Sequence, residues 1–101
     1  MKVGIVGLGA VGSGIQRLFP DAAVYDGPKR IGSRDEVNSC AVVFVCVPTP
    51  SLPDGACDTS IVEEVVSWLD GPVIVIRSTV SVGTTRRLAE QHHKPIVFQP
   101  E

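Results

Sequence analysis

The sequence predicts an α/β domain with a Rossmann-like, doubly wound parallel sheet of about five strands. Short runs rich in valine and isoleucine alternate with stretches of helical period along the whole chain. The runs are apolar at nearly every position, which indicates strands that are covered on both faces, as in parallel sheets. With right-handed crossovers, this alternation favours the strand order 2-1-3-4-5, with helices on both faces.

Each expected strand is bounded by glycine, proline or polar residues. The strands are expected over residues 2–6, 22–26, 42–47, 73–76 and 96–98. Helices are expected over 10–19 and 83–91, with one helical turn at 34–38. A further helix begins at Ser60, which forms a capping box with Glu63, and ends before Gly71. Its expected buried face consists of Ile61, Val62, Val65, Val66 and Leu69.

Composition indicates one globular domain over residues 1–101, with 44% hydrophobic residues and a net charge of −2. No basic run suggests a nucleic-acid partner. The longest apolar run, 41–48, is far below the ~20 residues that span a bilayer, so no membrane partner is expected. Three cysteines without a CxxC pair favour reduced thiols and a cytoplasmic location. Cys46 is expected in the core, and Cys40 and Cys57 in polar loops.

A GxGxxG motif follows the first strand and opens the first helix. Gly7 permits the tight turn, Gly9 lets the backbone approach a pyrophosphate, and Gly12 lets the helix pack against the strand. Ala10 and Val11 begin the helix, whose unpaired N–H groups and positive dipole end attract phosphates. This context predicts a dinucleotide site; the alternative is a glycine turn in a domain that binds no nucleotide.

Asp26 closes the second strand, where a dinucleotide site needs an acid to accept hydrogen bonds from the adenine ribose. A carboxylate there repels a 2′-phosphate and favours NAD over NADP as the cofactor. Lys29 and Arg30 follow closely and could hold such a phosphate, although a solvated loop is the preferred interpretation of both. For Asp26 itself, the alternative is a turn aspartate before Gly27.

Polar segments also follow the third, fourth and fifth strands. They are Val47-Pro48-Thr49-Pro50, Ser78-Thr79 and Pro100-Glu101. Because the carboxyl ends of parallel strands meet at one sheet edge, these segments are expected to gather beside the glycine turn. The two prolines end the third strand rigidly, so that Val47, Pro48 and Thr49 can face a cofactor ribose.

Four separated stretches resemble the N-terminal NAD-binding domain of the UDP-glucose/GDP-mannose dehydrogenases. They are the opening 2–12, the VPTP segment 47–50 with Asp54-Gly55 and Asp58 after it, Ser78-Thr79-Val80 with Gly83-Thr84-Thr85, and Pro100-Glu101. The resemblance implies NAD as cofactor and a two-step oxidation of the C6 alcohol of a nucleotide sugar to a carboxylate. It also implies that Thr79 helps to hold the catalytic water and that Glu101 acts as a base.

No stretch resembles the family's nucleophilic cysteine, catalytic lysine or sugar-binding domain. Covalent catalysis needs that thiol, so the chain is expected to bind NAD without completing the reaction by itself. A stand-alone nucleotide-binding module or partner subunit stays open as an alternative, as does part of another NAD-dependent dehydrogenase. The short connection after Asp26 also leaves the second strand at a sheet edge, and exposed edges favour pairing as a homodimer.

Overall fold

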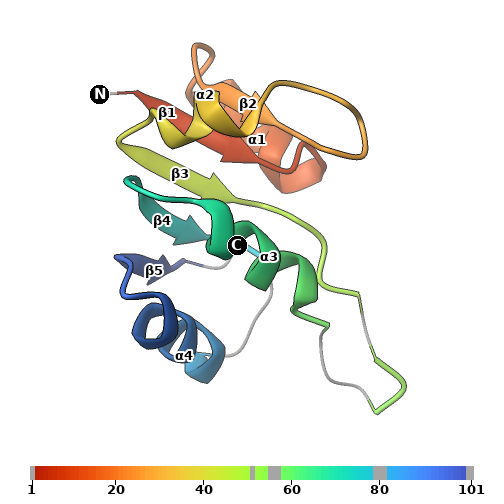
Figure 1. The fold of residues 1–101 in the computed structure, drawn as a ribbon. Helices are drawn as coiled ribbons and strands as arrows, with labels where there is room; N and C mark the ends of the chain where they lie inside the picture. The colour runs from red at the N-terminus through yellow and green to blue at the C-terminus, as the bar shows by residue number, and fades with distance from the viewer. Residues whose placement is uncertain (1, 51, 55–57, 79–81, 100–101) are drawn as a thin grey trace.

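The computed structural model describes residues 2–50, 52–54, 58–78 and 82–99. A single parallel sheet with the strand order β2-β1-β3-β4-β5 runs through the molecule (Figure 1). The strands are β1 (Val3–Val6), β2 (Ala23–Tyr25), β3 (Val42–Val45), β4 (Val73–Ile76) and β5 (Ile96–Phe98). The order and direction predicted from the sequence are confirmed.

The register brings the carboxyl ends of all five strands to the same edge of the sheet. Val6 lies opposite Tyr25 on one side and Val45 on the other. Val45 lies opposite Ile76, which lies opposite Phe98. The loops that leave these strands therefore start from one line, and their residues can share one site.

Helices cover the two faces of the sheet unequally. The helices are α1 (Ala10–Leu18), α2 (Arg34–Asn38), α3 (Ser60–Trp68) and α4 (Val82–His92). Val37 of α2, Val66 of α3 and Leu88 of α4 belong to one buried cluster with the strand residues Val43 and Ile74, so these helices share a face. The other face carries α1, which packs on β1.

On the α1 face, the far part of the sheet keeps apolar side chains in contact with solvent. Val73 and Val97 retain 37% and 51% of their surface, because among the described residues only α1 lies on that side. Phe19, just after α1, stacks on Phe44 of β3 with ring centroids 5.9 Å apart. Within the described residues, α2, α3 and α4 therefore cover one face of the sheet, and α1 covers only part of the other face.

The start of α3 differs from the expected capping box. Thr59, and not Ser60, is the N-cap residue, and its hydroxyl donates to the Glu63 carboxylate at 2.9 Å. The Asp58 carboxylate accepts the Ser60 backbone N–H at 2.9 Å, and the hydrogen bonds from Ser60 lower the pKa of Asp58. An acid two residues before the helix thus satisfies the N–H of the first helical residue.

Three side chains differ from the expected burial. Ile61 is 36% exposed, since the face of α3 that meets the core consists of Val62, Val65 and Val66, with Leu69 just after the helix. Cys40 is buried beneath α2, and burial raises the pKa of its thiol. Cys46, expected in the core, is half-buried. None of the helices in the described ranges has the length and apolarity that a bilayer-spanning segment requires.

Candidate functional site

A cavity of about 500 Å³ lies at the carboxyl edge of the sheet, over the ends of β1, β2, β3 and β4. Its lining comes from four loops that are far apart in the sequence. The lining residues are Gly7, Leu8, Gly9, Ala10, Val11, Asp26, Pro28, Lys29, Cys46, Val47, Pro48, Thr49, Arg77 and Ser78.

Most residues that the sequence singled out as cofactor contacts meet at this cavity. Those in its lining are Gly7, Gly9, Ala10, Val11, Asp26, Val47, Pro48, Thr49 and Ser78. Gly12 is buried against the glycine turn and Ile5. Thr79 and Glu101, the two residues with expected catalytic roles, lie outside the described residues, as do Cys57 and Pro100.

The glycine turn is built from two positions that admit no side chain. Gly7 has φ +94°, and a Cβ there would lie 2.8 Å from the Cys46 carbonyl oxygen. A Cβ on Gly12 would lie 2.0 Å from the Gly7 carbonyl oxygen. At Gly9, by contrast, a Cβ would meet nothing within 4 Å. The backbone at Gly9 is therefore open to a ligand at the start of α1.

Asp26 joins the end of β2 to the glycine turn. Its Oδ2 accepts the Leu8 backbone N–H at 2.8 Å, and its Oδ1 accepts the Lys29 N–H at 3.1 Å. The backbones of Asp26 and Ile31 also exchange two hydrogen bonds, which close the loop 26–31. Asp26 is thus the turn aspartate of the alternative interpretation and a lining residue of the cavity at once.

Lys29 lies in an exposed loop, as expected, and has a further role there. It is exposed, but it lines the cavity, and its ammonium donates to the Leu8 carbonyl oxygen. The backbone of Leu8 is therefore held at its N–H by Asp26 and at its carbonyl oxygen by Lys29. Arg30 is exposed, as expected, and has φ +55°.

Ser78 connects the ends of β3 and β4. Its buried hydroxyl donates to the Val47 carbonyl oxygen at 2.6 Å. The hydroxyl proton is thereby used within the protein, and only the oxygen lone pairs remain for a ligand. This bond fixes the segment that leads into Pro48 and Thr49.

Arg77 is a lining residue that the sequence analysis missed. Its side chain follows β4 directly, and its buried Nε has no hydrogen-bond partner within the described part of the chain. A buried N–H of a charged group is costly to leave without a partner. A signal was available, because an arginine directly after a buried apolar strand stands at the expected ligand edge.

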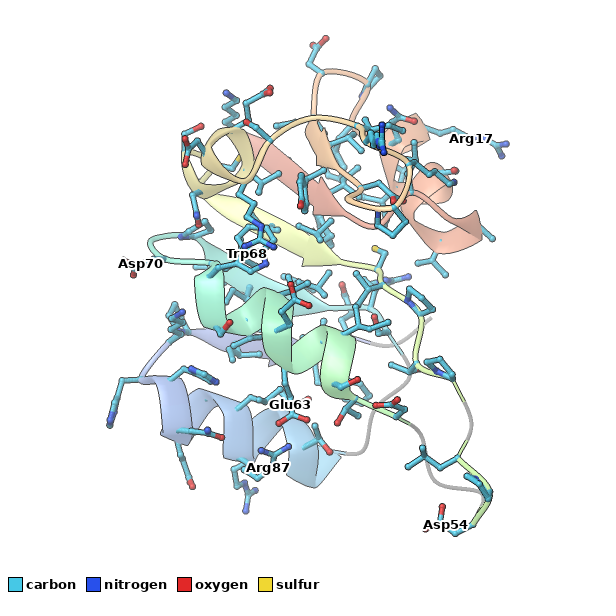
Figure 2. The ribbon with its side chains drawn as sticks, turned by 45° about the vertical axis from the view of Figure 1, so that its right-hand side comes forward. Arg17, Asp54, Glu63, Trp68, Asp70 and Arg87 are labelled. Atoms are coloured by element: carbon cyan, nitrogen blue, oxygen red, sulfur yellow. The ribbon has the colours of Figure 1, made fainter. Side chains whose placement is uncertain are left out.

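An ion pair ties the two helices that follow this edge. Glu63 of α3 and Arg87 of α4 point toward each other, with 3.1 Å between Oε1 and Nη1 (Figure 2). The hydrogen bonds from Thr59 and Arg87 lower the pKa of Glu63 below its ordinary value of 4.5. In the part of the chain that the structure describes, no cluster of metal-ligating side chains occurs.

The fold and the lining of the cavity define a dinucleotide-binding domain. The model of the UDP-glucose/GDP-mannose dehydrogenase family, NAD binding domain, matches residues 29–98, more than half of the chain. The chain belongs to this family.

Similarity to individual proteins agrees with this assignment. An uncharacterized protein of Methanocaldococcus jannaschii is 39% identical over 70 residues, which are 59% of this chain and 8% of that protein. A UDP-N-acetyl-D-mannosamine dehydrogenase of Methanococcus maripaludis is 35% identical over 77 residues, 67% of this chain and 18% of that protein. These matches therefore span less than a fifth of either relative.

The solved structure of a UDP-D-ManNAc dehydrogenase from Pyrococcus horikoshii has the same fold, with a TM-score of 0.82. The match covers all of this chain and 36% of that one, at 20% sequence identity. At this identity, the likeness establishes the shared fold.

Proposed function

We propose that this chain binds NAD in the cavity at the carboxyl edge of its sheet, as the cofactor-binding part of a nucleotide-sugar 6-dehydrogenase. The observation that carries the proposal is the convergence of the glycine turn, Asp26 and the segment 47–49 on one cavity of about 500 Å³. A dinucleotide needs a phosphate site, a ribose site and an apolar wall next to one another. The glycine turn, Asp26 and the segment 47–49 supply these three in that order.

The start of α1 fits the two phosphates. Peptide N–H groups of the first turn have no partner within a helix, and the dipole adds positive charge there. The open space at Gly9 admits a phosphate, and Arg77 is a cation at the same cavity. Its Nε, which lacks a partner in the described residues, fits an anionic oxygen.

Asp26 fits the adenine ribose. Each of its carboxylate oxygens already accepts one backbone N–H, and each keeps a lone pair for a ribose hydroxyl. Its negative charge disfavours a 2′-phosphate, which supports NAD over NADP. Lys29 and Arg30 act in the opposite direction, because a positive charge attracts a 2′-phosphate.

Thr49 and Ser78 then border the nicotinamide half, with backbone carbonyls and the Thr49 hydroxyl as hydrogen-bonding groups. NAD, when bound, supplies a hydride acceptor. By resemblance to the family, Thr79 orients a water molecule and Glu101 takes a proton. A nucleotide sugar is the proposed substrate of the whole enzyme, with its sugar site supplied by another domain or subunit.

Calorimetry tests the cofactor site. Wild-type protein should bind NAD, and Asp26→Asn should weaken binding about tenfold or more, since a hydrogen bond to a charged group contributes ~1.5–3 kcal/mol. Asp21→Asn removes the same charge at an exposed position outside the cavity and should leave the affinity unchanged. No heat with millimolar NAD would refute the proposal, and tighter binding of NADP would correct it.

A turnover assay separates an enzyme from a binding module. We expect no NADH from the chain alone with UDP-glucose or GDP-mannose, because covalent catalysis needs a nucleophilic cysteine. Addition in trans of a relative's sugar-binding domain, which carries the nucleophilic cysteine, should give NADH formation. Binding without turnover under every such condition would instead favour a nucleotide-binding module or partner subunit.

Homodimerisation is part of the proposal. The support is β2, a short strand at the edge of the sheet. Exposed edges tend to be paired or covered. Light scattering should show a mass of twice 10.7 kDa, and a monomer at high concentration would refute it.

The proposed location is the cytoplasm. It is supported by an odd number of cysteines without a CxxC pair, which suits reduced thiols. Fractionation of cells expressing the tagged chain checks this.

A further inference from the structure

A second cavity, of about 260 Å³, lies beside the first one. The two cavities share Gly7, Asp26, Pro28, Val47 and Pro48 in their linings. The shared wall includes the residue proposed to hold the adenine ribose. A ligand anchored at Asp26 can therefore extend into both cavities.

The second cavity has one cationic wall, the guanidinium of Arg34 at the start of α2. The Arg34 Cζ lies 4.9 Å from the ring centroid of Trp68 and 5.9 Å from that of Tyr25. The two rings meet edge to face, with centroids 5.4 Å apart and an interplanar angle of 83°. Two aromatic rings on different elements thus position one planar cation.

Hydrogen bonds also fix the orientation of this guanidinium. Nη2 donates to the Glu64 carboxylate at 3.2 Å, and Nε donates to the Tyr25 hydroxyl oxygen at 3.4 Å. Two of its five N–H groups are therefore used within the protein, and its charge has a carboxylate partner. The side chain still keeps 49% of its surface exposed. The guanidinium therefore offers a ligand an accessible flat surface.

Pro28, Pro48 and Ile61 supply apolar walls, and the carboxylates of Asp26 and Glu64 also line the cavity. Ile61, which the sequence pattern assigned to the core, is thus one of the apolar walls. A flat cation beside apolar walls suits a planar heteroaromatic base, which can stack on a guanidinium plane. A phosphate is less suited to this place, because the Glu64 carboxylate already neutralises the charge of Arg34 and would repel a second anion.

We propose that Arg34 is the base-recognition residue of this site, and that the adenine of the dinucleotide lies in the second cavity against its guanidinium. This rests on the proposed function, because the ribose at Asp26 is what directs the base there. Trp68, Tyr25 and Glu64 act as positioning residues, since they hold Arg34 and leave its outer surface accessible.

The chain carries one tryptophan, so its fluorescence reports on this cluster. Titration with AMP should change the Trp68 emission, whereas nicotinamide mononucleotide should not. Arg34→Ala should weaken the binding of AMP and NAD about tenfold, within the range for loss of one base-stacking contact. Binding of nicotinamide mononucleotide, measured by calorimetry, should stay unchanged.

Two matched variants keep the test independent of folding. Arg17→Ala removes the same charge from an exposed position of α1, where Arg17 points away from the domain (Figure 2), and should bind like wild type. Glu64→Gln keeps the Arg34 side chain but removes its charged partner, so adenine nucleotides should still bind more tightly than to Arg34→Ala. Thermal melts verify that each variant is folded.

The outcomes separate the two proposals. NAD binding that is unaffected by Arg34→Ala, or AMP binding without a change in Trp68 emission, overturns the role of Arg34 and leaves the NAD site standing. A preference for NADP that Arg34→Ala abolishes also overturns it, because Arg34 would then bind a phosphate. Absence of binding by both NAD and AMP overturns the two proposals together.

Discussion

The carboxylate of Asp26 accepts the backbone N–H of Leu8 at 2.8 Å, which links the end of β2 to the glycine turn after β1. An acid in this position therefore supports the turn before any ligand arrives. Asp26→Ala should make the Leu8 amide exchange with solvent hydrogen at least about tenfold faster, since a local hydrogen bond is lost. Exchange measured by NMR checks this, with Asp21→Ala as control; equal Leu8 rates in both variants would contradict it.

Two glycines of α1 should respond in opposite ways to the same substitution. Gly12→Ala should destabilise the domain by about 3 kcal/mol or more, because its Cβ would overlap the Gly7 carbonyl oxygen. Gly14→Ala should stabilise it by ~0.5–1 kcal/mol, because its Cβ meets nothing within 4 Å and alanine favours the helix. Urea unfolding measures both, and similar effects of the two substitutions would contradict the close contact at Gly12.

Arg77→Gln should weaken NAD binding about tenfold through the loss of a charge-assisted hydrogen bond to phosphate. Salt screens such an attraction, so the variant should also show a weaker dependence of its dissociation constant on ionic strength. Arg86→Gln, at an exposed position of α4, is the matched control. An unchanged salt dependence in Arg77→Gln would show that Arg77 does not meet the phosphates.

Glu63 should contribute to the acid sensitivity of the fold. Its pKa is lowered in the folded state, so its stabilising effect is present above its unfolded value of 4.5 and is lost as pH falls through the lower, folded value. Because the carboxylate is partly exposed, the effect should be roughly 0.2–1 kcal/mol. Glu63→Gln should therefore lose less stability than wild type below about pH 5, as followed by melting temperature.

Glu90→Gln provides the control for this titration. It removes the same charge from an exposed position of α4 without altering the contacts of Glu63 with Thr59 and Arg87. Its pH profile should follow that of wild type. A Glu63→Gln profile that also follows wild type would show that the contacts of Glu63 do not contribute to the free energy of unfolding.

The predictable features were those that depend on neighbours in sequence. Apolar runs of strand length and helical periods between them predicted the parallel sheet and its order, and the carboxyl edge followed from the direction of the strands. The glycine turn and the end of β2 meet at that edge for the same reason. Strand ends shifted by one or two residues, because hydrogen bonding and not side-chain pattern decides where a ladder stops.

The features that escaped prediction depend on contacts between distant residues. Arg34 meets Trp68 and Tyr25 only because α2 and α3 lie on the same face of the sheet. Lys29 reaches Leu8 across a closed loop, which no periodicity encodes. Cys40 lies in a loop, as its polar neighbours indicated, but it is buried because the turn after α2 folds back onto the sheet.

The closed loop after β2 has a consequence for sequence comparison. The bridge between Asp26 and Ile31 fixes how far the chain travels before α2 begins, and thereby where Arg34 stands relative to Asp26. An inserted or deleted residue between these two positions would move Arg34, the proposed base-recognition residue, away from Asp26 even if every side chain were retained. Among relatives of this chain, the length of the loop between the acidic residue after β2 and the next helix should therefore correlate with nucleotide preference. This correlation should be as close as the one with the identity of the residues at the site.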